Sequence, residues 1–299
     1  MNRPLTICAS LTILALAACG NPEAPGHIAE DDGAPRVATV QAPDGLTLTY
    51  ETRGTGDTTV LLIHCWTCDR EFWREQVDAL AQDYRVVTLD LGGHGESPGE
   101  RESWRVLDYG ADVQAVADAL ELQRVVLVGH SMGGPVALEA ARRLGQRALG
   151  VICVDTLHDA DFEFPEEMAQ QWIAGLEQDF EAAMAEAMGG MAASGIDPAV
   201  RDWIVQRAIA ASPEMAVGLM RDFLTLDLPQ MFRDAGAPIR CVNAAPPAVP
   251  PTNVEGNRRY ADYDAVILEG VGHFIQLERP EEFNAQLREF VAGFESDSR

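Results

Sequence analysis

Hydrophobic and polar positions follow two different patterns along this chain. Short apolar runs at residues 59–65 and 124–128 are typical of strands that are buried on both faces. Residues 69–82 and 107–122 instead carry apolar side chains at helical spacing. Strands that alternate with helices predict right-handed crossovers and a mostly parallel central sheet flanked by helices. The expected fold class is therefore α/β.

The same alternation continues towards both ends of the chain. Residues 37–41 and 46–52 alternate apolar and polar side chains, and the Asp-Gly pair at residues 44–45 between them is a hairpin signal. The remaining expected strands are residues 85–91, 149–154, 239–244 and 265–268, and the remaining expected helices are residues 132–144, 253–260 and 280–294.

The alternation is interrupted at residues 157–233, which look helical throughout. Residues 167–188 and 198–211 show the clearest helical spacing, and Trp, Phe and Met side chains occur among these segments. We therefore expect one α/β domain over residues 37–299, with a helical cap insertion at about residues 157–233.

The first 36 residues are not expected to belong to this domain. Arg3 precedes an apolar stretch at residues 5–18, which has the length of a signal-peptide core and is too short to span a bilayer. The stretch ends in Leu-Ala-Ala-Cys, which resembles a bacterial lipobox with Cys19 as the acylated residue. We expect a lipoprotein-type signal peptide over residues 1–18 and a flexible tether over residues 19–36. An ordinary signal peptide that contains a cysteine is the alternative.

Charge and composition narrow the range of partners. The formal net charge is −25, and all 22 basic residues are arginines. Without a basic stripe, a nucleic acid is not an expected partner. Without lysine, Schiff-base chemistry on the protein is excluded. We expect an exported protein that touches a membrane only through its N-terminal lipid anchor. Gly20 after the cysteine favours the outer membrane, facing the periplasm.

The strongest chemical motif is Gly-His-Ser-Met-Gly at residues 129–133. It follows an expected strand and opens an expected helix, as in a nucleophile elbow, where a sharp turn lifts the serine hydroxyl above the sheet. The helix N-terminus behind it favours developing negative charge. These features indicate Ser131 as a nucleophile.

Three further motifs extend this reading over residues 37–294. They are residues 64–66 (His-Cys-Trp), residues 90–97 (Asp-Leu-Gly-Gly-His-Gly-Glu-Ser) and residues 270–273 (Gly-Val-Gly-His). In this order they resemble the loops of the α/β-hydrolase family. The resemblance implies His273 as the general base and the backbone N–H groups of Trp66 and Met132 as the oxyanion hole. Cys65 departs from the glycine that is usual in the family.

The acid of the triad is less evident. The resemblance leads us to look for an aspartate after the seventh strand, but residues 242–248 contain no carboxylate. A variant of the family places the acid after the sixth strand, where Asp155 stands here. We therefore expect Asp155 to orient His273, with Asp159 and Glu255 as alternatives.

Four cysteines lie within the expected domain. Cys65 and Cys68 form a C-x-x-C on the expected oxyanion loop, which is better explained by a local disulfide than by redox catalysis. Cys153 and Cys241 lie mid-strand and are expected to be small buried residues.

We therefore predict a serine hydrolase that cleaves an ester-type bond in a small molecule through an acyl-enzyme, without a metal or other cofactor. Thioesterase, lactonase, amidase and C–C hydrolase activities use the same machinery and stay open. A non-catalytic lipoprotein that binds a small ligand on this fold is the alternative from another class. The sequence leaves the oligomeric state open.

Overall fold

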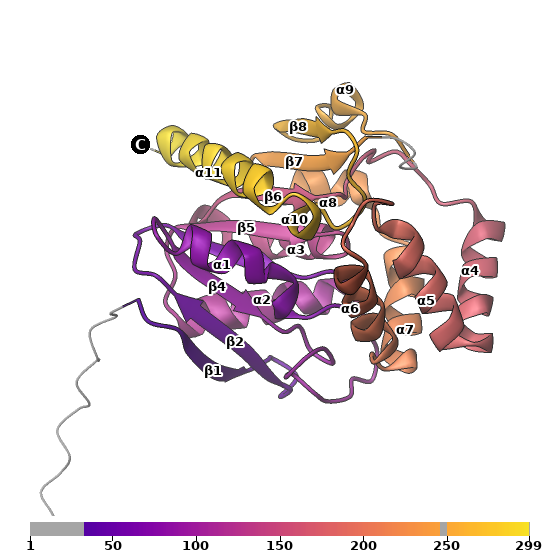
Figure 1. Ribbon diagram of the computed structural model, residues 1–299. Helices are drawn as coiled ribbons and strands as arrows, with labels where there is room; N and C mark the ends of the chain where they lie inside the picture. The colour runs from indigo at the N-terminus through magenta and orange to yellow at the C-terminus, as the bar shows by residue number, and fades with distance from the viewer. Residues whose placement is uncertain (1–32, 246–249, 299) are drawn as a thin grey trace, which may run out of the picture. The chain divides into compact units, whose positions relative to one another are not determined.

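In the computed structural model, which describes residues 33–245 and 250–298, eight strands form one sheet in the order β1-β2-β4-β3-β5-β6-β7-β8 (Figure 1). β2 pairs antiparallel with both β1 and β4, and all other neighbours are parallel. The strands are β1 (Arg36–Gln41), β2 (Thr47–Arg53), β3 (Thr59–Ile63), β4 (Arg85–Leu89), β5 (Val125–His130), β6 (Ala148–Val154), β7 (Ile239–Ala244) and β8 (Tyr263–Leu268).

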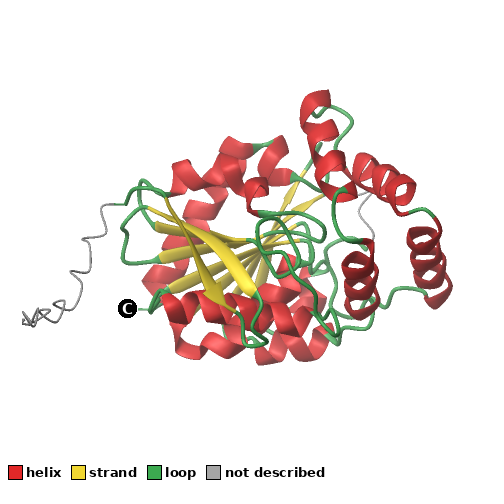
Figure 2. Cartoon of the chain, turned by 90° about the horizontal axis from the view of Figure 1, so that it is seen from below, coloured by secondary structure: helices red, strands yellow, loops and turns green. Residues whose placement is uncertain are grey.

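Helices cover both faces of the sheet, as Figure 2 shows. Every residue of β3 and β5 is buried, because their alternating side chains enter two separate cores. Val126 and Val128 pack with Leu80 of α1 and Leu287 of α11, whereas Leu127 packs on the opposite face with residues of α2 and α3. The helices and short 3₁₀ turns around the sheet are η1 (Arg70–Trp73), α1 (Arg74–Leu80), α2 (Val106–Ala119), α3 (Gly133–Leu144), η2 (Gly145–Arg147), α8 (Leu228–Asp234), α9 (Val254–Asn257), α10 (Ile275–Glu278) and α11 (Pro280–Asp297). The predicted mostly parallel sheet flanked by helices is confirmed.

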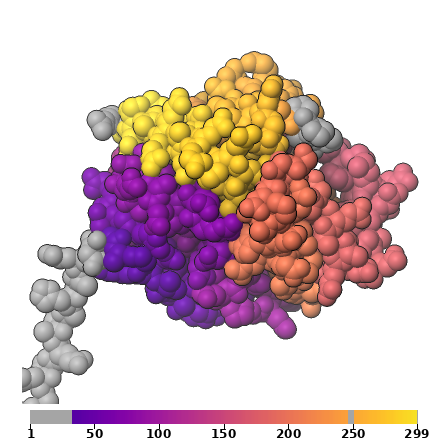
Figure 3. Space-filling model, viewed as in Figure 1, coloured from indigo at the N-terminus to yellow at the C-terminus, as the bar shows by residue number. Residues whose placement is uncertain are grey.

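Four helices between β6 and α8 gather beyond the end of the sheet at which β5 and β6 terminate (Figure 1). We call them the cap helices: α4 (Glu166–Gln178), α5 (Phe180–Met191), α6 (Pro198–Ile209) and α7 (Pro213–Phe223). In the space-filling view they lie beside the C-terminal segment, while α11 lies against the N-terminal third of the chain (Figure 3). α8, which follows the cap helices, packs on α3. The division into a main domain and a cap at about residues 157–233 stays a prediction.

One expected helix, at residues 167–188, is divided in the structure. Asp179 adopts an extended conformation with φ −153° and ends the regular spiral between α4 and α5. Its side chain accepts the N–H of Ala182, which caps α5. The helical spacing continues across this break, so the apolar pattern alone did not reveal it.

Several predictions lie outside the described residues. The signal peptide at residues 1–18, Cys19 and most of the tether fall in the segment 1–32, which the structure does not describe. Over the residues that it does describe, no helix is long and apolar enough to cross a membrane. In the same residues, no group of three or more His, Cys, Asp or Glu side chains is placed to hold a metal ion.

Candidate active site

Ser131 stands at a sharp turn between β5 and α3. Its φ is +54°, a left-handed conformation that is uncommon for a residue with a side chain. The turn needs glycine on both sides: a Cβ at Gly129 would come within 2.0 Å of the Gly133 carbonyl oxygen, and one at Gly133 within 2.6 Å of the Ile63 oxygen. The Ser131 N–H donates to Val154 in the neighbouring strand at 3.0 Å. The backbone therefore fixes the serine at the carboxyl edge of the sheet.

Asp155 and His273 meet at the same edge. Asp155 directly follows β6, and its Oδ2 lies 2.6 Å from Nδ1 of His273. Its Oδ1 accepts the N–H of Ala244 at 2.9 Å. Burial opposes the charge on Asp155, but the hydrogen bonds and charge of His273 and the Ala244 N–H outweigh it, so the pKa of Asp155 lies below its ordinary value. The carboxylate is thus held ionised against the histidine ring.

The two alternative acids are engaged elsewhere. Asp159 accepts the side-chain N–H of Asn253 at 3.0 Å. Glu255 pairs with Arg258, and its side chain is 84% exposed. Neither carboxylate has a contact with His273 among the described residues. The structure therefore brings together Ser131, His273 and Asp155.

His130, which precedes the serine, holds the loop that carries His273. One ring nitrogen, Nδ1, accepts from the side-chain amide of Gln276 at 3.1 Å. The other, Nε2, donates to the carbonyl of His273 at 2.8 Å, an assignment that follows from this hydrogen-bond network. Burial, together with the nearby His273, lowers the pKa of His130 to about 3, so the ring is neutral. The contact with the His273 carbonyl could not be read from adjacency to Ser131.

The expected oxyanion loop is closed by a disulfide. Cys65 and Cys68 are bonded, and Trp66 lies between them. Trp66 and Met132 both line the cavity that contains Ser131, and among the described residues neither backbone N–H donates a hydrogen bond. The Trp66 indole N–H donates to the carbonyl of Ala216 in α7 at 2.9 Å. Two donors are therefore available beside the serine: Met132 at the start of α3, and Trp66 on a loop that is tied to a cap helix.

His64 and His94, which lie in two of the motifs, have structural contacts. Nε2 of His64 accepts the N–H of Leu91 at 3.0 Å, so Nδ1 donates to the Cys65 carbonyl at 2.8 Å. Burial lowers the pKa of His64 and of His94, and both rings are neutral.

Glu278 is a residue that the sequence analysis missed. Its carboxylate accepts backbone N–H groups of Gly272 and Phe274, on either side of His273, and of Ala193, just after α5. It therefore joins the histidine loop to the cap helices. The available signal was an acidic residue at the end of this loop, immediately before the Arg-Pro that opens α11.

The serine, the histidine and the aspartate border a cavity of about 740 Å³. Its wall is formed largely by apolar side chains from the segments between β6 and β7. They include Phe162, Phe164, Trp172, Met188, Met220 and Phe223. The volume and the few polar groups suit a small organic ligand.

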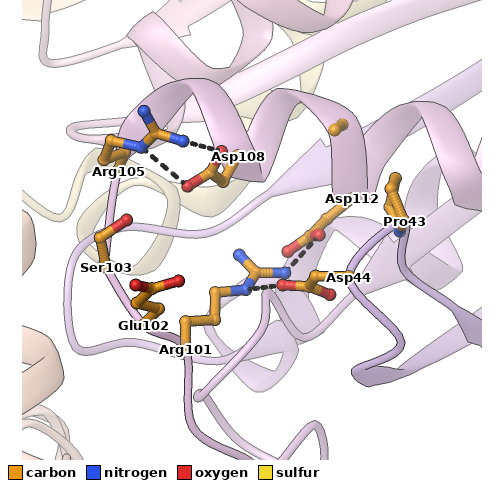
Figure 4. A pocket seen from close by; sticks show the side chains of 9 residues that line it. Pro43, Asp44, Arg101, Glu102, Ser103, Arg105, Asp108 and Asp112 are labelled. Atoms are coloured by element: carbon orange, nitrogen blue, oxygen red, sulfur yellow. Dashed lines mark hydrogen bonds and ion pairs between the residues drawn. The ribbon is translucent and has the colours of Figure 1, made fainter.

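A smaller hollow of about 220 Å³ is lined by other residues (Figure 4). Arg101 pairs there with Asp44 at 2.7 Å and with Asp112 at 2.6 Å. Asp112 also accepts the N–H of Gly92. Burial raises the pKa of Asp112 to about 6, although the paired Arg101 opposes this. The cluster ties α2 to the loops after β1 and β4, and we interpret it as structural.

Comparison with known proteins agrees with this architecture. Residues 58–189 match a family model described as the alpha/beta hydrolase fold. An esterase from Thermogutta terrifontis superposes with a TM-score of 0.74 at 24% identity, covering 87% of this chain and 99% of that one. An esterase from Exiguobacterium antarcticum gives a TM-score of 0.77 at 20% identity, covering 85% and 99%.

Curated relatives match over different lengths. The acetyltransferase component of an acetoin cleaving system from Cupriavidus necator is 34% identical over 139 residues, which are 46% of this chain and 37% of that protein. This chain therefore spans little more than a third of that relative, and only 26% of its counterpart from Pseudomonas putida. A pimeloyl-[acyl-carrier protein] methyl ester esterase from Edwardsiella ictaluri is 28% identical over 265 residues, covering 82% of this chain and 98% of that protein.

Proposed function

We propose that this chain, which has the α/β-hydrolase fold, is a serine hydrolase that cleaves an ester-type bond in a small molecule through an acyl-enzyme. One observation carries the proposal. The 2.6 Å contact between Asp155 and Nδ1 of His273 lies on the same cavity as Ser131 at its strained turn. The cavity is thus lined by side chains suited to act as a nucleophile, a base and a group that orients the base.

The proposed reaction has two steps. Nε2 of His273 takes the proton of Ser131 as Oγ attacks the carbonyl carbon, and then gives it to the leaving oxygen. The N–H groups of Trp66 and Met132 stabilise the oxyanion. Water activated by the same histidine then releases the acid. Among the described residues Ser131 Oγ has no hydrogen bond to the ring, and such contacts commonly tighten only with substrate.

The ester class has support from a relative. The Edwardsiella protein of similar length is named for a methyl ester esterase activity. Thioester, lactone, amide and C–C bond cleavage use the same groups, so a substrate panel must separate them. The alternative from another class is a non-catalytic protein that binds a small ligand in the cavity. The seventh strand without a carboxylate favours that alternative, whereas the contact between Asp155 and His273 supports the hydrolase.

The test is labelling with a fluorophosphonate probe, followed by assays of 4-nitrophenyl esters, thioesters, lactones and amides. Wild type should label and Ser131→Ala should not. Ser131→Ala and His273→Ala should each lower kcat about 10³-fold or more, without adding when combined, because the two residues act as a unit. A Ser131→Ala protein that retains wild-type esterase activity would refute the mechanism.

We also propose that the protein is exported and lipid-anchored through Cys19, as its N-terminal sequence indicates. A diacylglycerol anchors stably because it supplies two acyl chains. Intact-mass analysis of the mature N-terminus should show the acylated cysteine, and Cys19→Ser should abolish it. An unacylated N-terminus created at another position would contradict the proposal.

A further inference from the structure

The charges around the cavity all have one sign. Among its described lining residues the acidic side chains are Asp155 and Asp159, and none is an arginine. The sequence contains no lysine, so the described lining residues include no permanently charged cation. His158, which also lines the wall, has a pKa lowered by burial and is neutral. Apart from His273, whose Nδ1 is already held by Asp155, an anionic group inside the cavity would therefore meet carboxylates and no counter-charge.

A segment that contributes to the cavity wall, residues 159–167, is also acidic. Residues 159–167 carry five acids and no base, and two phenylalanines of this segment, Phe162 and Phe164, line the cavity. Asp161 is paired with Arg259, which leaves four acids in excess. The whole chain has a net charge of −25, so its field also repels anions before they reach the site.

Apolar contact, by contrast, is plentiful. Aromatic and methionine side chains form most of the wall, and about 740 Å³ is far more than an acetyl group fills. Each methylene that leaves water for such a wall favours binding by about fourfold. An acyl chain therefore gains affinity by lengthening, whereas a carboxylate at its end loses hydration without finding a partner.

We propose that the site takes esters with an extended, uncharged apolar acyl group and selects against acyl groups that bear a free carboxylate. This inference rests on the proposed hydrolase function. The apolar side chains favour uncharged acyl groups. The absence of a cation from the wall disfavours acyl groups with a carboxylate, because their charge finds no partner.

The experiment compares two esters of equal chain length, 4-nitrophenyl hexanoate and 4-nitrophenyl monoadipate. They differ only in the terminal methyl or carboxylate. We expect kcat/KM for the hexanoate to exceed that for the monoadipate by about 100-fold or more, because the buried carboxylate has no partner. 4-Nitrophenyl acetate should also be poorer than the hexanoate. Equal kcat/KM values for hexanoate and monoadipate would overturn the inference.

Matched variants locate the effect. Met220→Arg places a cation in the cavity wall, and Met168→Arg makes the same change on α4 at a residue that is 53% exposed and does not line the cavity. Met220→Arg should lower the hexanoate-to-monoadipate ratio about tenfold, and Met168→Arg should leave it unchanged. Met191→Arg, at a lining residue that is 41% exposed, serves if Met220→Arg does not fold. Equal shifts at cavity and control positions would contradict a local cause.

A binding measurement separates this inference from the proposed chemistry. Ser131→Ala protein cannot form the acyl-enzyme, and Trp66 and Trp172 in the wall report occupancy by their fluorescence. We expect the hexanoate ester to quench this fluorescence at concentrations about 100-fold below those of the monoadipate. Equal binding would refute the selectivity. Failure of the wild type to label with fluorophosphonate would instead refute the hydrolase function and leave the binding result to decide the selectivity.

Discussion

Asp155 combines two properties that matter for its proposed role. It follows β6 rather than β7, with φ +45°, and its carboxylate points to Nδ1 of His273. Because its pKa is lowered from 3.8, it stays ionised above about pH 4 and loses its charge only below that. A fall in activity as the pH drops just below neutrality should therefore come from the protonation of another group.

The first prediction concerns this carboxylate. Asp155→Asn should lower kcat by up to ~10⁴-fold, because an amide favours the wrong tautomer of His273. Asp159→Asn and Glu255→Gln, which lack a contact with the ring, should change kcat less than about threefold. Steady-state kinetics on one ester measures all three. Loss of activity in Glu255→Gln, with Asp155→Asn still active, would assign the acid to α9 instead.

Sequence motifs were sufficient to propose Ser131, His273 and Asp155, because each follows a strand end within a recognisable local pattern. Glu278 and the His130 contact with the His273 carbonyl were not predictable in the same way. Both depend on which distant segments lie against the histidine loop, and local patterns do not contain that information.

At the scale of the element, the proposed oxyanion loop is held by three interactions. The Cys65–Cys68 disulfide closes it on itself, and Asp69 just beyond pairs with Arg207 of α6 at 3.1 Å. Trp66 adds the hydrogen bond to α7. A loop with these ties presents its N–H groups in one arrangement, which oxyanion stabilisation requires.

The second prediction follows from that restraint. Replacing Cys65 and Cys68 together with serine, or reducing the disulfide, should lower kcat about tenfold and change KM little, since oxyanion contacts form in the transition state. Burst kinetics with and without dithiothreitol measures the effect. Cys153→Ser and Cys241→Ser proteins, which keep the disulfide, should show the same response to reductant. Unchanged kcat in the double variant would show that the loop is held without the bond.

Strands and helices of the main sheet were predictable because burial on two faces leaves continuous apolar runs in the sequence. The boundary between α4 and α5 was not, because a single extended residue, Asp179, interrupts the helix without changing the periodicity on either side. Packing of cap helices over the cavity likewise depends on tertiary contacts, such as Trp66 with Ala216.

At the scale of the whole molecule, the protein carries a large excess of negative charge. The chain has 47 acidic residues and 22 arginines. Many arginines already form ion pairs with surface carboxylates. The carboxylates in excess repel one another across the folded surface, which destabilises the compact state.

The third prediction is that salt stabilises the fold. Raising NaCl from about 10 to 300 mM should raise Tm by about 2–5 °C, because the screening length falls below the spacing of surface charges. KCl should act equally, since screening depends on ionic strength rather than on the ion. Differential scanning calorimetry measures the shift. A Tm independent of salt would mean that local ion pairs already neutralise the repulsion.

His273 follows β8, which is the edge strand of the sheet and, within residues 33–245 and 250–298, pairs only with β7. β8 is partly exposed along most of its length, whereas β5, which leads to Ser131, is buried throughout. Fraying of this edge would withdraw the base while the centre of the sheet stayed intact. The free energy needed to open this edge, and so to lose activity, would then be lower than the free energy of global unfolding. In a urea titration, activity should be lost at a lower concentration than far-UV circular dichroism, and coincident midpoints would show that the edge opens only when the whole protein does.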